Sequence, residues 1–365
     1  MNENERYRRQ ITLKGFGEIG QKKLAGSKIL IVGIGGLGCP ALLYLAASGA
    51  GSIGIADDDF VALSNLPRQV LFSTEDVGQL KVEVAKKKIN ELNPEVKIIS
   101  YHQRLTNENA IDILEKYDVI IDGTDNFPSK YLLNDACILL NKPLVYGSVS
   151  KFEGQVAVFN VADKKNVTCN YRDLFPQPPA EEILNCSEEG VLGVVTGIIG
   201  TMQANEAIKL LTGIGDPLIN HLLIFNALNN QSYLIEITGN KEAYHVPSNE
   251  NEFRKTNYDW LCTPDQKINV INHKQFREML DEKEVLVVDV REAGEKPEVD
   301  FHHKKIPLSN FQNEIEKIAE NKIVFFCQTG KRSLDAAQML LDQYGETKKV
   351  YSLKDGVLSL QTFNS

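Results

Sequence analysis

The sequence predicts an α/β fold in two parts. A larger domain has a mainly parallel sheet that antiparallel strands extend, and a small α/β domain follows it. Strands alternate with helices between residues 29 and 148, which is the pattern of a parallel sheet with right-handed crossovers. The same alternation begins again after residue 267. A chain of 365 residues suits two domains of ordinary size.

The first strand, at residues 29–32, ends at glycines spaced G-x-G-x-x-G (Gly33, Gly35 and Gly38), and an apolar helix at 39–50 follows. Such glycines let the backbone turn tightly and approach a phosphate, which a helix N-terminus also attracts. A second strand, at 52–56, ends in an acidic cluster with Asp57 and Asp59, about 20 residues downstream, where a carboxylate would meet a ribose hydroxyl. These features predict a Rossmann-like nucleotide site, with NAD as the default ligand.

The remaining elements of the first domain follow from periodicity and turn residues. Helices are predicted at 74–93, 107–116, 131–140 and 194–211, strands at 96–101, 119–122, 143–148 and 153–160, and a closing antiparallel pair at 222–226 and 232–237. The proline-rich residues 169–185 are expected to form a long loop. Because ligands of parallel sheets bind beyond the carboxyl ends of the strands, Asp57, Asp125 and Asn126 should meet there.

The second domain carries a candidate nucleophile. A buried strand at 323–326 runs into Cys327, a short loop and a helix at 334–344. A cysteine that faces loop amides and a helix N-terminus should have a depressed pKa, and Lys331 and Arg332 add positive charge. The pattern therefore predicts a thiolate nucleophile in an anion-binding loop.

Composition excludes several classes of function. A formal net charge of −9 argues against a nucleic-acid binder, which needs clustered Lys and Arg. Residues 1–10 are polar and no apolar run would cross a bilayer, so the expected location is the cytoplasm, away from membranes. The six cysteines include no C-x-x-C pair, which excludes a zinc site built from two such pairs and indicates reduced thiols.

Residues 6–210 carry six motifs in order. They are Arg6-Tyr7-x-Arg9-Gln10, the glycine loop, Asp57-x-Asp59, Ser64-Asn65-Leu66-x-Arg68-Gln69, Lys81 and Asp122-x-x-Asp125-Asn126. Together they resemble the ThiF/MoeB/HesA family, bacterial relatives of the ubiquitin-activating enzymes. About residues 268–358 resemble a rhodanese domain, on Asp289-Val290-Arg291-Glu292 and Cys327-x-x-Gly330-x-Arg332-Ser333. We expect a Rossmann-like ThiF/MoeB domain at 1–238, a linker at 239–266 and a rhodanese-like domain at 267–365.

The resemblance implies a reaction. ATP adenylates the C-terminal glycine carboxylate of a ubiquitin-like sulfur carrier protein of the ThiS/MoaD type and releases pyrophosphate, and the rhodanese-like domain supplies sulfur. Bringing two anions together needs fixed positive charge and a metal. By the family's pattern, Arg68 and Lys81 hold the phosphates and Asp125 binds Mg²⁺.

The resemblance also implies the other contacts. Asp57 accepts from the ribose, Gly36 lets the nucleotide approach the backbone, and Asn65 and Gln69 orient phosphate and ribose. The remaining binding residues are Gly33, Gly35, Gly38, Asp59, Ser64, Asn126 and, in the second domain, Arg332. Arg9 is expected to reach the γ-phosphate of the partner subunit's ATP, which implies a homodimer.

The sequence departs from the family's pattern at the zinc site. Members commonly hold zinc with two C-x-x-C pairs, but Asn170 and Asp173 occupy the positions of one pair and no second pair follows. We therefore expect no zinc, with the loop held by packing alone. In the rhodanese-like domain, residues 293–301 lack the usual apolar passage, while the Cys327 loop is intact.

Several questions stay open. Cys186 is at the position of a loop cysteine that in some members is covalently catalytic, yet Glu188 and Glu189 would raise the pKa of its thiol, so covalent and structural roles are both compatible. The carrier could serve molybdopterin or thiamine-thiazole synthesis, and a cysteine desulfurase could donate the sulfur. An NAD-dependent oxidoreductase has no use for the motif at 64–69, and a non-catalytic carrier-binding scaffold has none for Arg68 or Lys81.

Overall fold

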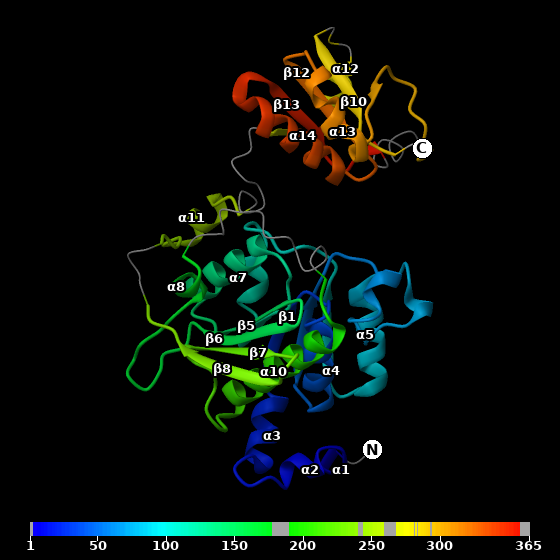
Figure 1. Cartoon of the computed structure of the whole chain (residues 1–365). Coiled ribbons are helices and arrows are strands. Elements are labelled where there is room, and N and C mark those ends of the chain that lie inside the picture. The colour runs from blue at the N-terminus through cyan, green and yellow to red at the C-terminus, as the bar shows by residue number, and fades with distance from the viewer. Residues whose placement is uncertain are drawn as a thin grey trace. The chain divides into compact units, whose positions relative to one another are not determined.

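The computed structural model describes residues 3–176, 190–239, 244–258, 268–280, 282, 284–292 and 294–357. The chain divides into two compact units, Met1–Pro264 and Asp265–Ser365, each built on one sheet (Figure 1). The predicted fold class is confirmed, since the first sheet is mainly parallel with an antiparallel extension and the second is a small parallel sheet with helices.

The sheet of the first unit has the strand order β3-β2-β1-β4-β5-β6-β7-β8. Its strands are β1 (Lys28–Val32), β2 (Ser52–Ala56), β3 (Lys97–Tyr101), β4 (Val119–Asp122), β5 (Leu144–Ser150), β6 (Glu153–Phe159), β7 (His221–Asn226) and β8 (Gln231–Glu236). Neighbours from β3 to β5 are parallel, and those from β5 to β8 are antiparallel. All parallel strands therefore end at one edge of the sheet.

Helices cover both faces of this sheet. Ile29 and Ile31 of β1 pack in a core with α4 (Gly38–Ala47), α5 (Lys81–Leu92) and α10 (Gly193–Thr212). Leu30 and Val32 pack on the other side, in a core with α6 (Ala110–Leu114) and α7 (Phe127–Leu140). Because successive strand residues point to opposite faces, a continuous apolar strand serves both cores, and each fully buried side chain contributes about 1.5–3 kcal/mol.

The second unit has a five-stranded parallel sheet in the order β11-β10-β12-β13-β9. Its elements are β9 (Ile268–Ile271), α12 (His273–Leu280), β10 (Val285–Asp289), β11 (Lys304–Lys305), α13 (Phe311–Glu314), β12 (Lys322–Phe326), α14 (Lys331–Tyr344) and β13 (Lys349–Leu353). Along β12, Phe325 joins one core, whereas Val324 and Phe326 join the other. The central strand β12 delivers Cys327 to the carboxyl edge of the sheet.

The helix predicted from residue 74 begins only at Lys81. Residues 74–76 form a 3-10 turn, in which the Asp76 carboxylate accepts from the Ser73 N–H at 2.7 Å. Gly78 takes a φ of +86°, a conformation that a continuous helix excludes. Lys81 is therefore the first residue of α5 and lies at the carboxyl edge of the sheet. Other helix bounds differ as well. The helix predicted at 39–50 ends at Ala47, and the one predicted at 107–116 shortens to α6. The helices predicted at 131–140 and 334–344 begin earlier, at Phe127 and Lys331.

Residues 244–258, inside the stretch predicted to be the linker, pack on the first unit. Phe253 of α11 (Glu250–Lys255) is fully buried in the core beside α7. The Tyr258 hydroxyl donates to the buried Asp135 carboxylate at 2.9 Å. Of the loop predicted at 169–185, the described residues 169–176 contain the short helix α8 (Tyr171–Leu174), and the rest lies outside the described residues. No helix among the described residues has the length and apolar content to cross a membrane.

Candidate active site

A pocket of about 500 Å³ opens at the carboxyl edge of the parallel strands in the first unit. Four helices begin at its wall, because Leu37, Lys81, Asn126 and Thr196 lie at the first turns of α4, α5, α7 and α10. A helix N-terminus carries partial positive charge and free N–H groups. The volume suits a cofactor-sized ligand, and the converging helix ends favour an anionic one.

The glycine loop forms one wall. Gly33 has a φ of +87°, and a Cβ there would lie 2.7 Å from the Gly123 carbonyl oxygen. A Cβ at Gly38 would lie 1.9 Å from the Gly33 carbonyl, so a side chain at either position would push the loop apart. Asp57 fixes the loop from the next strand, because its Oδ2 accepts from the Ile34 N–H at 2.6 Å.

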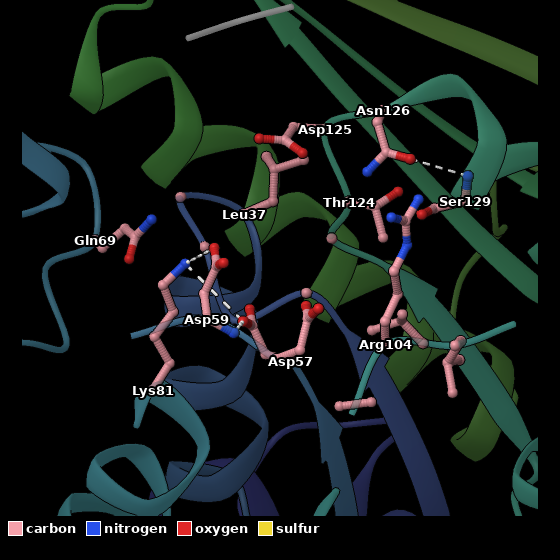
Figure 2. Close-up of a pocket in the computed structure, with 18 of the residues that line it drawn as sticks. Leu37, Asp57, Asp59, Gln69, Lys81, Arg104, Thr124, Asp125, Asn126 and Ser129 are labelled. Atoms are coloured by element: carbon pink, nitrogen blue, oxygen red, sulfur yellow. Dashed lines mark hydrogen bonds and ion pairs between the residues drawn. The ribbon is translucent and has the colours of Figure 1, made fainter. Parts of the chain in front are cut away.

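Lys81 lies between the carboxylates of Asp57 and Asp59, which follow the carboxyl end of β2 (Figure 2). Its side chain is buried, and its Nζ is 2.8 Å from Asp59 Oδ2 and 4.0 Å from Asp57 Oδ1. Burial raises the pKa of Asp57, whereas the Lys81 charge opposes that rise. The arrangement places a buried cation in the pocket wall with two carboxylates beside it.

Asn65 ends the 3-10 helix Leu63–Asn65, and Arg68 and Gln69 come from the turn that follows it. Arg68 Nη1 donates to the Ser64 carbonyl at 3.0 Å, and Asn65 Oδ1 accepts from the Ala62 N–H. Gln69 is buried, and its Oε1 has no hydrogen-bond partner among the residues that the structure describes. A buried acceptor without a partner at a pocket wall suits a ligand that donates a hydrogen bond.

Asp125 lies on the loop between β4 and α7. Lys130 stabilises this loop, because its Nζ donates to Asp122 Oδ2 at 2.9 Å and to the Thr124 carbonyl at 3.0 Å. Asn126 caps α7 by accepting from the Ser129 N–H at 3.0 Å. The Asp125 carboxylate is left exposed in the pocket wall, which is the kind of oxygen donor that Mg²⁺ takes.

Most of the predicted site residues of the first domain meet at this pocket. Its wall includes Gly33, Gly35, Gly36, Asp57, Asp59, Asn65, Arg68, Gln69, Lys81, Asp125 and Asn126. Gly38 starts α4 just behind the wall, and Ser64 contributes its carbonyl to Arg68. Arg9 is exposed on α2 (Arg8–Ile11), outside the wall of its own chain's pocket, and Cys186 lies outside the described residues.

The sequence analysis missed two further parts of the wall. Gln103, Arg104 and Leu105 follow β3, so the rule that placed Asp57 and Asp125 could have found them. Figure 2 shows Arg104 on the side of the pocket near Thr124 and Asn126. The other part consists of Ser148 and Val149 on β5, Val191 just before α10, and Thr196 in α10. The sequence carries no local signal that places these residues at the pocket.

The second unit holds Cys327 at the end of β12. The residue is fully buried, and its Sγ accepts from the Gly330 N–H at 3.1 Å. Arg332, predicted as a binding residue of this loop, forms a two-pronged ion pair with Glu295 at 2.6 and 2.7 Å. The bond to Arg332 lowers the pKa of Glu295 to about 2. A carboxylate therefore balances the positive charge of the loop.

Hydrogen bonds join Asn170 and Asp173, the two positions that the sequence resemblance aligns with zinc ligands. Asn170 Nδ2 donates to Asp173 Oδ2 at 2.9 Å and to the Tyr244 hydroxyl at 2.7 Å. That hydroxyl donates to Asp173 Oδ1 at 2.6 Å. The three side chains tie α8 to the segment that leads toward the second unit. The prediction that packing alone holds this loop therefore needs a correction, because polar contacts also hold it.

We expect Tyr244→Phe to lower the stability of the first unit by about 1–2 kcal/mol, because two neighbouring polar groups lose a partner. Thermal unfolding measures this loss. Tyr233→Phe is the matched control, since its hydroxyl bonds only Gln231 on the exposed strand β8 among the contacts described. We also expect a chelator such as EDTA to leave the unfolding temperature unchanged. A drop on chelation would mean that a metal, and not this network, holds the loop.

The sequence matches two families of known proteins. Residues 7–246 match the model of the ThiF family, and residues 272–362 match that of the rhodanese-like domain. The chain is 38% identical to the probable adenylyltransferase/sulfurtransferase MoeZ of Mycobacterium tuberculosis, over 91% of this chain and 86% of that protein. It is 41% identical to the adenylyltransferase and sulfurtransferase MOCS3 of Culex quinquefasciatus, over 88% of this chain and 74% of the relative.

Two further likenesses concern the first unit. The sulfur carrier protein adenylyltransferase of Thermus thermophilus is 43% identical over 71% of this chain and 97% of its own length. A crystal structure of E. coli MccB with ATP superposes with a TM-score of 0.56 at 21% identity, over 65% of this chain and 75% of that one, and so supports the fold alone. The resemblance found in the motifs is confirmed: the chain belongs to the ThiF family and carries a C-terminal rhodanese-like domain.

Proposed function

We propose that this protein uses ATP to adenylate the C-terminal carboxylate of a ubiquitin-like sulfur carrier protein, and that Cys327 carries sulfur for the same carrier. The observation that carries the proposal is the pocket in which Lys81, Arg68 and Asp125 surround a space at four helix N-termini. Two of the relatives carry names that combine adenylyltransferase with sulfurtransferase, which supports both halves. The third is named as a sulfur carrier protein adenylyltransferase, which supports the first half.

Each group of the wall has a task in this reaction. Asp57 accepts from the ribose hydroxyls, while the glycine loop lets the phosphates approach the backbone. Lys81 and Arg68 neutralise the triphosphate, so that the carrier's carboxylate can attack the α-phosphorus. The new bond joins the carboxylate oxygen to the α-phosphorus, and the bond to the β-phosphate oxygen breaks, releasing pyrophosphate. Asp125 would hold Mg²⁺, which supplies charge stabilisation to the phosphates.

The protein should act as a homodimer in which Arg9 reaches the partner's nucleotide. In support, Arg9 is exposed on α2 and does not line the pocket of its own chain. Exposed apolar side chains on the edge strand β8 (Tyr233, Leu234 and Ile235) offer a surface on which a partner protein could pack. A cysteine desulfurase is the proposed source of sulfur for Cys327.

The deciding experiment is ATP–pyrophosphate exchange with a molybdopterin-type and with a thiazole-type carrier, each with and without its terminal glycine. We expect exchange with one carrier that is lost when the glycine is removed. Exchange with neither carrier, although ATP binds, would contradict the proposed substrate. Magnesium is tested in the same assay by adding EDTA, which should stop the exchange.

Lys81→Met is expected to lower kcat/KM for ATP in this exchange by about 100–1,000-fold. The variant removes a cation from the phosphates and also leaves Asp57 and Asp59 unbalanced beside them. Lys88→Met is the matched control on the same helix, because Lys88 pairs with Asp76 and does not line the pocket. A loss of only a few fold in Lys81→Met would remove Lys81 from the catalytic group.

A further inference from the structure

Two buried serine hydroxyls stand behind Cys327. Ser333, in the first turn of α14, and Ser352, on β13, are both almost fully inaccessible to solvent. The Ser352 hydroxyl donates to Ser333 Oγ at 2.9 Å, and the Ser333 hydroxyl donates to the Gly330 carbonyl at 2.8 Å. Cys327 Sγ lies 3.6 Å from Ser333 Oγ, with the thiol donating. A chain of three side chains therefore runs from β13 to the sulfur.

The hydrogen bonds of Ser333 depend on whether Cys327 is protonated. A hydroxyl has one proton to donate and two lone pairs to accept with. In the thiol state, Ser333 accepts from both Cys327 and Ser352 and donates to Gly330, so all of its capacity is used. When Cys327 loses its proton, Ser333 loses one donor and faces a thiolate that needs hydrogen bonds. Its own hydroxyl can then turn from the Gly330 carbonyl to the sulfur.

We propose that Ser352 is a positioning residue for Cys327. It holds the Ser333 oxygen in place and polarises it, so that the Ser333 hydroxyl donates to the sulfur when Cys327 is ionised. The Gly330 N–H already donates to Sγ at 3.1 Å, so the thiolate receives two hydrogen bonds of different origin. The proposal rests on the sulfur-transfer half of the proposed function, since that half requires a thiolate at Cys327.

The place of Ser352 in the fold suits this task. Ser352 pairs with Phe325, which lies two residues before Cys327 on the neighbouring strand β12. Its strand, β13, lies inside the sheet between β12 and β9, and a site built on such an element is held more precisely than one on a loop. Among the described side chains, the charged groups at the loop include Arg332 within it and Glu292 and Glu295, which raise the pKa of Arg332. The backbone of Asp355, on the turn after β13, lies close to Gly330. Ser352 is uncharged, so its contribution is separable from theirs by substitution.

The chemistry needs a good thiolate twice. Cys327 attacks the sulfane sulfur of a donor such as thiosulfate, a new S–S bond forms, the donor's S–S bond breaks, and sulfite leaves with the electron pair. An acceptor such as cyanide then takes the outer sulfur as thiocyanate and returns the thiolate. Hydrogen bonds that stabilise the thiolate favour the first ionisation and make Cys327 a better leaving group in the second step.

The test follows carboxamidomethylation of Cys327 by iodoacetamide in the full-length protein, between about pH 5 and pH 10, with the Cys327 peptide quantified by mass spectrometry. We expect Ser352→Ala to move the pH midpoint of the reaction upward by about 0.5–1 unit and to slow it about 3–10-fold near neutral pH. Ser352→Thr, which keeps the hydroxyl, should restore the midpoint. Thermal unfolding is measured in parallel.

A double substitution shows whether Ser352 acts through Ser333. We expect Ser333→Ala to move the midpoint as well, and Ser352→Ala to add nothing in that background. An unchanged midpoint in Ser352→Ala, with or without a lower unfolding temperature, would reduce Ser352 to a structural hydrogen bond, and additive shifts would also overturn the proposal. If the unmodified protein makes no thiocyanate from thiosulfate and cyanide, sulfur transfer is what fails, and the alkylation profiles still judge the role of Ser352.

Discussion

Asp125→Ala should abolish carrier-dependent ATP–pyrophosphate exchange, with a loss of at least about 100-fold, while the protein stays folded. The carboxylate is exposed in the pocket wall, and the contacts that shape its loop belong to its neighbours: Lys130 binds the Thr124 carbonyl, and Asn126 caps α7. Removing the Asp125 side chain therefore removes the proposed metal ligand and should leave the scaffold intact.

The control for this variant is Asp216→Ala, at an exposed aspartate that follows α10 and is absent from the pocket wall. It should keep full exchange. Circular dichroism and thermal unfolding check the fold of both variants. Raising the magnesium concentration should recover part of the activity of a weaker variant, Asp125→Asn, but little of Asp125→Ala. An Asp125→Ala protein with normal exchange would remove Asp125 from the proposed metal site.

Cys327→Ser should eliminate sulfur transfer from thiosulfate and leave ATP–pyrophosphate exchange at its normal rate. A serine hydroxyl stays protonated near neutral pH and cannot attack a sulfane sulfur as a thiolate does. The substitution is close to isosteric, and the Gly330 N–H can still donate to the new oxygen, so the loop should keep its shape. The chain forms two compact units, so a substitution in the second should leave the activity of the first unchanged.

Cys39→Ala is the control for this second prediction. Burial raises the pKa of the Cys39 thiol to about 12, so it is protonated near neutral pH and cannot serve as the sulfur nucleophile. Sulfur transfer should persist in Cys39→Ala. If Cys327→Ser still transferred sulfur, the nucleophile would have to be another thiol, and Cys186 would be the first to test.

The parts of the site that sequence predicts are those that depend on local rules. Gly33, Asp57 and Asp125 each follow a buried strand, and the topology of a parallel sheet brings such positions together. The start of α5 at Lys81 depends on one residue, Gly78, whose positive φ separates the 3-10 turn from the helix. The apolar residues across 74–93 recur at helical spacing on both sides of Gly78, so the sequence pattern does not reveal where the helix begins.

The parts that sequence does not predict depend on contacts between distant residues. Val191 and Thr196 reach the pocket because α10 packs against the turn before Arg68, where a Cβ on Gly193 would lie 2.1 Å from the Pro67 carbonyl oxygen. The Arg332–Glu295 pair joins residues 37 positions apart, and Ser352 reaches Ser333 across a strand and a helix. No periodicity or motif encodes such pairings.

The ion pair between Lys81 and Asp59 has a consequence for turnover. In the proposed reaction, a phosphate of ATP competes with Asp59 for Lys81, and the Asp59 side chain is 70% exposed, so it can return to water at little cost. The net gain in affinity is then smaller than an unpaired lysine would give. After the proposed reaction the same carboxylate can pair with the ammonium again, which would favour the release of pyrophosphate. The competition would therefore shorten the time for which the product stays bound.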